Sequence, residues 1–413
     1  MAALDGMRIL DLTQYEAGTS CTQALAWLGA DVVKVEPPRL GDPGRTADGG
    51  NRDALYFLSL NHNKRSVAIN LKSAQGRELF LSLLPKFDAV IENFTLGTME
   101  RLGLGYDVLE EHRPGIIYGT IKGFGASGPY KDYKCYDFVA QAAGGAISVT
   151  GERDGPPIRP GPTFADSGTG FNMALGILAA YVQQQRTGEG QVVEVSMQDS
   201  IINFMRTQLS FRERYPDGVV RRRGNRTVSP TNLYPCAPGG PNDYIQLMVV
   251  TDRMWDALIT AIGRPELGTD ERFATITDRR ENGDALDEEI SAWTMQRTKW
   301  EAMEFLAAAG VPASAVFDSH DILSHPHLVE RGQVVTYDHP TYGEQTMPAS
   351  PIRMSASQVP MQRAPLLGEH THELLERELD LSTAEVEQLR AEGVIGPASR
   401  QPEDELATAH PRF

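Results

Sequence analysis

Asp166 is the residue whose setting most clearly suggests chemistry. It stands in the stretch GPTFADSGTG (161–170), directly before an apolar segment that predicts a helix over 169–186. A carboxylate at a helix start is kept ionised by the helix dipole, and it can either cap the helix or attack a bound carbonyl as a nucleophile. The flanking glycines would let a substrate carbonyl approach backbone N–H groups. The residues themselves leave both interpretations open, with Asp166 or Ser167 as the cap.

A group of basic residues between positions 31 and 72 is the second candidate. Seven basic side chains stand there against five acids, which reverses the sign of the whole chain. The turns that follow the strands of an α/β sheet are where ligands gather, so this group favours an anionic ligand over the alternative of solvated loop charges. The seven residues are Lys34, Arg39, Arg45, Arg52, Lys64, Arg65 and Lys72.

Other familiar motifs do not fit. GFGASG (123–128) matches GxGxxG, but it continues into Pro129 and more loop instead of opening a helix, which argues against a dinucleotide site. GxSxG, HExxH and GxxxxGK[ST] are absent from the sequence. The two His-x-His pairs at 325–327 and 370–372 fall in predicted loop or helix, so we interpret them as surface histidines and expect no metal site.

Composition narrows the class of protein. The chain has 413 residues, 41% apolar and 23% charged, with a formal net charge of −16. This balance predicts an ordinary globular protein with no broad affinity for nucleic acid. The three cysteines form no CxxC, and charges interrupt the N-terminal apolar run. We therefore expect a cytoplasmic protein with no membrane span and no zinc finger.

Short β-rich runs alternate with helical segments through the first half of the chain. Crossover-length connections between such runs favour an α/β fold with a Rossmann-like, doubly wound parallel sheet. The strands are expected at 7–12, 31–36, 87–92, 115–121 and 191–196, with helices near 20–29, 73–85, 169–186 and 197–212.

Three regions are expected along the chain. Residues 1–212 would form the large Rossmann-like domain, 225–330 a smaller α+β domain after an arginine-rich loop, and 331–413 a segment returning to the large domain. Residues 366–413 hold eleven acids against four arginines, which predicts two acidic helices with a solvated face and a disordered end after Pro397.

Six segments, in order along nearly the whole chain, resemble the family III coenzyme A transferases, and among them the branch that uses formyl-CoA and oxalate. They are LDLTQYEAGTSCTQALAWLGADVVKVE (10–36), LYFLSLNHNKRSVAINLK (55–72), VIENFTLGTMERLGLGY (90–106), KCYDFVAQAAGGA (134–146), PGPTFADSGTG (160–170) and APLLGEHT (364–371). The resemblance implies a Rossmann-like large domain built from both chain ends, a small domain between them and an interlocked homodimer.

The resemblance also implies the site. Asp166 takes the place of the family's nucleophilic aspartate, and coenzyme A enters as a thioester substrate, with no permanently bound cofactor. Its phosphates would be neutralised by cations such as Lys72 and Arg101. The implied coenzyme A residues are Tyr15, Arg39, Ile69, Asn70, Leu71, Lys72, Asn93, Phe94, Arg101, Lys134, Tyr136 and Asp137; the implied substrate and oxyanion residues are Gln14, Glu16, Gly239 and Gly240.

Two departures concern the substrate. Glu16 stands where the formyl-CoA branch has a glutamine, and that branch's long glycine-rich loop is shortened to Pro238–Pro241. A carboxylate at position 16 would repel a small dianion such as oxalate unless it is protonated or paired. We therefore expect a CoA-transferase that uses an acyl-CoA donor and a small carboxylic acid acceptor, with Asp166 ionised and attacking the thioester.

Two alternatives share the fold. An α-methylacyl-CoA racemase needs a histidine base directly before the aspartate that aligns with Asp137, and this chain has Tyr136 there. A non-catalytic coenzyme A binding protein would have no need of Asp166.

Overall fold

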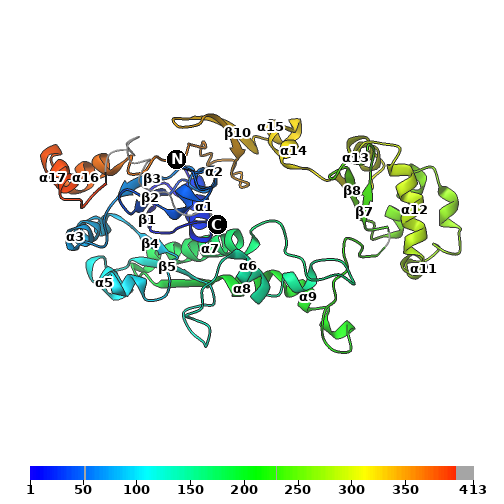
Figure 1. The fold of residues 1–413 in the computed structure, drawn as a ribbon, viewed down its shortest axis with the longest axis horizontal. Helices are drawn as coiled ribbons and strands as arrows, with labels where there is room; N and C mark the ends of the chain where they lie inside the picture. Colours follow the sequence, from blue (N-terminus) through cyan, green and yellow to red (C-terminus); the bar gives the residue numbers. More distant parts are fainter. Residues whose placement is uncertain (51–52, 229, 397–413) are drawn as a thin grey trace. The chain divides into compact units, whose positions relative to one another are not determined.

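Six parallel strands form the central sheet of this protein (Figure 1). Their spatial order is β3-β2-β1-β4-β5-β6, the order of a Rossmann-type doubly wound sheet. The order reverses between β1 and β4, and ligands of such sheets bind outside the carboxyl ends of the strands at this switch point. The strands are β1 (Arg8–Asp11), β2 (Asp31–Glu36), β3 (Arg65–Ala68), β4 (Ala89–Glu92), β5 (Ile117–Lys122) and β6 (Val192–Ser196).

The computed structural model describes residues 1–50, 53–228 and 230–396. These residues divide into two compact units. Unit 1 contains the parallel sheet and comprises Met1–Ile147, Arg159–Arg214 and the chain from Arg331 onward. Unit 2 comprises Ser148–Ile158 and Tyr215–Glu330. The fold is thus mixed α/β, with a parallel sheet in one unit and a smaller antiparallel sheet in the other.

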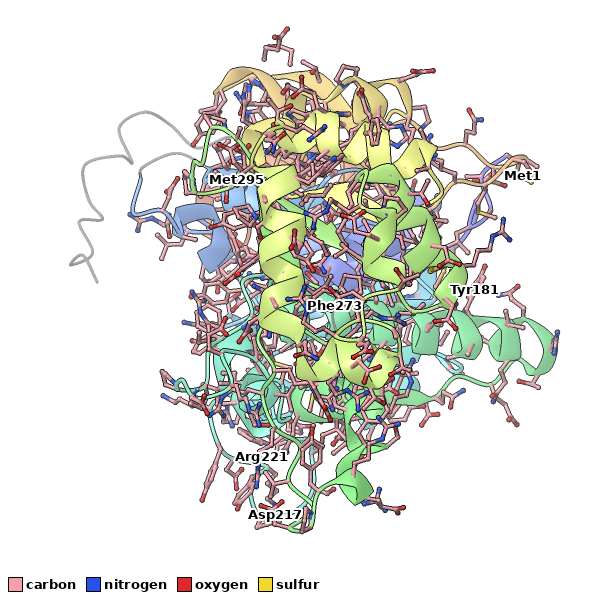
Figure 2. All side chains as sticks on the ribbon, turned by 90° about the vertical axis from the view of Figure 1, so that its right-hand side faces the viewer. Met1, Tyr181, Asp217, Arg221, Phe273 and Met295 are labelled. Atoms are coloured by element: carbon pink, nitrogen blue, oxygen red, sulfur yellow. The ribbon has the colours of Figure 1, made fainter. Side chains whose placement is uncertain are left out.

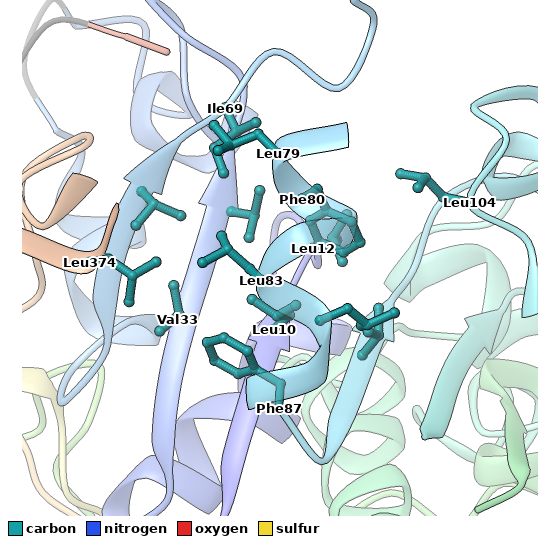
Figure 3. Close-up of a cluster of buried hydrophobic side chains, with 14 of the residues drawn as sticks. Leu10, Leu12, Val33, Ile69, Leu79, Phe80, Leu83, Phe87, Leu104 and Leu374 are labelled. Carbon is teal, nitrogen blue, oxygen red and sulfur yellow. The ribbon is translucent and has the colours of Figure 1, made fainter. Parts of the chain in front are cut away.

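Helices cover the parallel sheet, so its central strands are buried on both faces. Every residue of β4 and β5 is buried. Helix α3 packs Phe80 and Leu83 against Leu10 and Val33, and Leu374 from near the C-terminus enters the same core (Figure 3). The helices of unit 1 are α1 (Ala17–Trp27), α2 (Leu55–Leu60), α3 (Ala74–Leu83), α4 (Thr98–Arg101), α5 (Tyr106–His112), α6 (Asp137–Ala143), α7 (Phe164–Thr187), α8 (Met197–Phe204), α9 (Arg206–Leu209), α16 (Thr371–Leu379) and α17 (Thr383–Ala391).

The five strands predicted in the first half of the chain are confirmed as β1, β2, β4, β5 and β6. Strand β3 was not predicted, because four residues with two polar side chains give too short a pattern. Helix α7 begins at Phe164, earlier than the apolar pattern indicated. Asp166 therefore lies inside the first turn of α7.

Unit 2 contains an antiparallel sheet of three strands, β7 (Leu233–Pro235), β8 (Tyr244–Leu247) and β9 (Ala313–Ala315). Its own core includes Trp255 and Phe273, the latter labelled among its helices in Figure 2. The arginine-rich loop is confirmed, with an exposed ion pair between Asp217 and Arg221. The helices are α10 (Asp252–Ala261), α11 (Ile276–Glu281), α12 (Gly283–Thr294), α13 (Lys299–Ala308), α14 (Ser319–Ser324) and α15 (Pro326–Glu330).

The C-terminal part of the chain returns to unit 1. A hairpin of β10 (Val334–His339) and β11 (Gly343–Pro348) precedes α16 and α17. Glu378 on α16 accepts two hydrogen bonds from the guanidinium of Arg8 on β1, at 2.6 and 2.9 Å. Leu374 on α16 and Val386 on α17 are fully buried, so each of the two predicted acidic helices packs one face against unit 1. The end predicted to be disordered after Pro397 lies outside the described residues.

No helix among the described residues has both the length and the apolar character needed to cross a bilayer.

Candidate active site

Two loops meet at the switch point of the sheet. Gln14 follows β1, and Asn93 follows β4. The Asn93 side chain accepts a hydrogen bond from the Gln14 amide and donates one to the Gln14 carbonyl, both at 2.8 Å. Asn93 therefore fixes the backbone of the β1 loop, at the edge of the sheet where a ligand is expected.

The β1 loop turns sharply to deliver Glu16 to the start of α1. Tyr15 has a φ of 56°, and its amide donates to the Asp42 carboxylate at 3.1 Å. The left-handed conformation costs energy for a tyrosine, so this fixed partner stabilises the turn. The Glu16 carboxylate accepts hydrogen bonds from the hydroxyls of Thr163 and Ser167 at the start of α7, the latter at 2.7 Å. Glu16 thus joins the beginnings of α1 and α7.

Asp137 on α6 caps helix α7. Its carboxylate accepts hydrogen bonds from the amides of Ala165 at 2.9 Å and Asp166 at 3.1 Å. Of the two interpretations that the residues left open, the structure does not support capping by Asp166 or Ser167, since the residue at the N-cap is Thr163, which makes no side-chain capping bond. Because Asp137 satisfies these free amides, the Asp166 carboxyl is left available for other contacts.

Helices α1 and α7 approach each other closely at this site. A Cβ added to Gly170, one turn after Asp166, would lie 2.6 Å from the Ala17 carbonyl oxygen and 2.9 Å from the Cys21 amide nitrogen. Only glycine fits such a backbone contact. This contact places the first turn of α7 beside the N-terminus of α1.

Three carboxyl groups consequently gather around the start of α7. Burial, and then the negative charges of Glu16 and Asp137, raise the pKa of Asp166 to about 8. Burial also raises the pKa of Glu16 above its ordinary value, although the two hydroxyl hydrogen bonds oppose the rise. A pKa of about 8 contradicts the expectation that Asp166 is ionised at neutral pH in the free protein, and burial followed by the like charges of Glu16 and Asp137 is the cause.

A cavity of about 720 Å³ opens beside the β1 loop. Seven of the residues that the resemblance implies for coenzyme A or substrate line it, and its wall is mostly apolar. These seven are Gln14, Arg39, Ile69, Asn70, Leu71, Lys72 and Phe94. The structure therefore brings together residues from the ends of β1, β2, β3 and β4.

The other implied residues lie elsewhere. Arg101 turns back onto its own segment and donates to the Thr98 hydroxyl at 2.7 Å. Tyr136 packs edge-on against Tyr15, with ring centroids 6.2 Å apart, and Lys134 is exposed just before it. Gly239 and Gly240 belong to unit 2, in the turn between β7 and β8, and their part in the site stays a prediction.

Most residues of the basic cluster form ion pairs with acidic residues of the sheet and its loops, so they are not available to a ligand. Lys34 pairs with Asp42 at 2.8 Å, Lys64 with Asp11 at 3.0 Å and Arg45 with Glu36 at 2.7 Å, all of them buried. Arg65 pairs with Asp31. The interpretation of the whole cluster as an anion site is thus wrong for these four, and Arg52 lies outside the described residues. Only Arg39 and Lys72 of the cluster line the cavity.

Sequence reasoning missed the C-terminal contribution to the cavity. Arg390, Gly393, Ile395 and Gly396 all line it. The only sequence signal was Ile395 in a short apolar pair of an otherwise acidic region, which gives no indication of where the segment docks.

Comparison with known proteins assigns the family. The family model for CoA-transferase family III matches residues 4–371. The formyl-CoA:oxalate CoA-transferase of Streptomyces coelicolor is 41% identical over 409 residues, covering 95% of this chain and 99% of the relative. The enzyme of the same name from Rhodopseudomonas palustris strain BisA53 is 38% identical over 417 residues, covering 96% and 98%. The chain belongs to CoA-transferase family III.

Solved structures share the fold. A CAIB/BAIF family protein from Brucella suis superposes with a TM-score of 0.81 at 32% identity, over 91% of this chain and 99% of that one. Rv3272 from Mycobacterium tuberculosis gives a TM-score of 0.77 at 29% identity, over 90% and 98%. The α/β architecture of this chain is thus shared with these solved structures over about nine-tenths of its length.

Proposed function

We propose that this chain moves coenzyme A from an acyl-CoA donor to a small carboxylic acid, with Asp166 as the nucleophile. The observation that carries the proposal is the position of the Asp166 carboxyl. It lies in the first turn of α7, and Glu16 ties that turn to the β1 loop, whose Gln14 lines the cavity. Relatives at 38–41% identity are named formyl-CoA:oxalate CoA-transferases.

The cavity is the proposed site for coenzyme A. Arg39 and Lys72 are both exposed on its wall, and neither side chain has an ion pair with any described residue. They would neutralise phosphate charge, while Ile69, Leu71 and Phe94 provide apolar contact for the uncharged arm. The thioester end of coenzyme A would then extend past the β1 loop to Asp166 at the start of α7.

The proposed reaction proceeds through covalent Asp166 intermediates. An oxygen of ionised Asp166 attacks the thioester carbonyl and expels the coenzyme A thiolate, which leaves a mixed anhydride. The thiolate then attacks the Asp166 carbonyl, forms an aspartyl thioester and releases the donor acid. The acceptor carboxylate attacks this thioester, and the freed thiolate attacks the acceptor's carbonyl, which restores Asp166 and gives the new acyl-CoA.

Backbone amides would stabilise the oxyanions of these steps. Glu16 is the N-cap of α1 but makes no capping bond with its side chain, because its carboxylate binds α7. The amides of the first turn of α1, Ala17 and Gly18 among them, are therefore not capped by Glu16, and the helix dipole favours negative charge there. The turn at Gly239 and Gly240 is a second proposed donor.

Glu16 would determine the acceptor. A dianion such as oxalate would meet the charges of Glu16 and Asp137, and the residues near Asp166 that perturb its pKa include no cation. A monocarboxylate, or a hydroxy acid that donates a hydrogen bond to Glu16, is therefore the proposed acceptor class.

The assembly is proposed to be a homodimer. Phe164, Phe171, Leu175 and Val182 are each 44–60% exposed on α7. Their spacing of seven, four and seven residues places them within about 20° of one line along the helix. Such an apolar stripe on a surface fits contact with a second copy.

A matrix of acyl-CoA donors against carboxylate acceptors tests the proposed function. Separation of the products should show a new acyl-CoA only when both substrates are present. Mass spectrometry of peptides should reveal an adduct on Asp166 after incubation with acyl-CoA alone, and Asp166→Ala should lower transfer by several orders of magnitude while coenzyme A still binds. Exchange of an α proton in deuterated water without transfer would instead indicate a racemase.

A further inference from the structure

The C-terminal segment 393–396 is built into the edge of the parallel sheet. The Asn70 amide donates to the Val394 carbonyl at 2.8 Å, and the Gly396 amide donates to the Ala68 carbonyl at 3.0 Å. Val394 and Ile395 are almost completely buried. The segment therefore forms a fixed wall of the cavity beside the end of β3.

Arg390, in the last turn of α17, brings a charge to this wall. Its guanidinium donates to the Gly396 carbonyl, and its Nε lies 3.3 Å from the Glu387 carboxylate. The Glu387 side chain is 57% exposed, so water weakens its neutralising effect. Nη2 of Arg390 has no hydrogen-bond acceptor among the described residues. A positive charge and free N–H donors are thus left at the cavity wall.

The charge balance of the cavity wall is positive. Its three basic residues are Arg39, Lys72 and Arg390, and its single acidic residue is Glu36. Both oxygens of Glu36 accept hydrogen bonds from Arg45, each at 2.7 Å, and Oε1 also binds the Ser66 hydroxyl. Glu36 is therefore already neutralised, and the three basic groups are available to an anion.

The position of Arg390 indicates which end of coenzyme A it would meet. Arg390 donates to the Gly396 carbonyl, and Gly396 is hydrogen-bonded to Ala68 at the end of β3, whereas the proposed reaction takes place beyond β1. Strand β3 is two strands from β1, or about 10 Å at the usual strand spacing. Coenzyme A carries its thioester at one end and its adenosine 3′-phosphate at the other. We propose that Arg390 binds this 3′-phosphate, an assignment that rests on the proposed function.

Calorimetric titration with coenzyme A and with 3′-dephospho-coenzyme A tests this assignment. Wild-type protein should prefer coenzyme A, because a guanidinium–phosphate contact contributes on the order of ten- to a hundredfold in affinity. Arg390→Gln keeps a donor for the Gly396 carbonyl but removes the charge, so the preference should fall toward one while 3′-dephospho-coenzyme A binds as before. Arg390→Lys should restore part of the preference.

Arg377→Ala, which removes an exposed arginine of α16, is the matched control and should keep the preference. An unchanged preference in Arg390→Gln, or equal weakening of both ligands, would overturn the assignment. Those results would leave the proposed function intact, because wild-type protein would still bind coenzyme A and form the Asp166 adduct. Failure of wild-type protein in both assays would instead reject the proposed function.

Discussion

At the scale of single residues, the start of α7 is organised around negative charge. Asp137 is held by the amides of Ala165 and Asp166, and Glu16 by two hydroxyls, so each has a fixed place. Burial and then the negative charges of these two acids raise the pKa of Asp166 to about 8. A carboxylate that is costly to ionise is a more basic nucleophile once it is ionised, which suits attack on a thioester.

This arrangement predicts a pH profile. The reactive form of Asp166 is the ionised one, so kcat/KM should rise with pH and level off above about pH 8. Glu16→Gln removes a neighbouring charge and should move the rise to lower pH, and it should improve the use of oxalate relative to monocarboxylates. Steady-state rates from pH 5 to 9 with both acceptors measure this; a profile that does not shift would mean that Glu16 is already neutral.

Stability gives an independent measurement of the same group. The folded-state pKa of Asp166 lies above its ordinary value of 3.8, so its contribution to stability is complete below about pH 3.8 and is lost as the pH rises through about 8. Asp166→Asn should remove this loss. The difference in melting temperature between wild-type protein and Asp166→Asn should therefore be larger at pH 9 than at pH 6.

At the scale of elements, the contact between α1 and α7 holds the site together. Gly170 allows the backbones to touch, and Glu16 connects the two helix starts through Thr163 and Ser167. Because Asp166 is one turn from Gly170, a shift of α7 would move the proposed nucleophile away from the amides of α1. The close packing at Gly170 therefore determines where the Asp166 carboxyl lies relative to the amides of α1.

Gly170→Ala tests this contact. The added methyl group would overlap the Ala17 carbonyl oxygen, so the helices must separate, at a cost of about 1–3 kcal/mol in the free energy of unfolding. Transfer activity should fall by more than stability alone explains, since a small displacement of reacting groups is costly. Gly161→Ala is the control, because an added Cβ there has no neighbour within 4 Å. Denaturant titration and transfer rates of both variants measure the difference.

At the scale of the whole molecule, both ends of the chain build the same unit. Strand β1 and helix α16 are joined by Arg8 and Glu378, which are 370 residues apart. The hydrogen bonds from Arg8, with its charge, hold the pKa of Glu378 at about 2, so the pair persists throughout the neutral range. The stripe of Phe164, Phe171, Leu175 and Val182 on α7 belongs to this unit and is exposed in the single chain.

Light scattering measures the proposed homodimer. The particle mass should be about twice the 45.3 kDa of one chain. Leu175→Glu places a charge in the centre of the stripe and should shift the population toward single chains, because an unpaired charge is costly to bury. Gln183→Glu, about 100° away around α7, should leave the mass unchanged. A wild-type mass of one chain would contradict the proposal.

Local pattern determined much of this protein. The runs 31–36 and 87–92 are short and contain several valine or isoleucine residues, which are typical of buried parallel strands, so β2 and β4 were predictable. The motif around Asp166 and the resemblance indicated the family, which the comparisons confirm. Strand β3 was not predictable, since its four residues depend on the neighbouring β2 for their hydrogen bonds.

Tertiary structure decided which charged side chains are buried in ion pairs and which line the cavity. The sequence shows Lys34, Lys64 and Arg390 as equivalent basic residues, yet two of them are buried in ion pairs and the third lines the cavity. The sequence likewise predicted an ionised Asp166, whereas burial beside Glu16 and Asp137 reverses that expectation. Burial and charge pairing are properties of neighbours in space, and segments as distant as 69–72 and 390–396 become neighbours only when the sheet and the C-terminal segment have folded together.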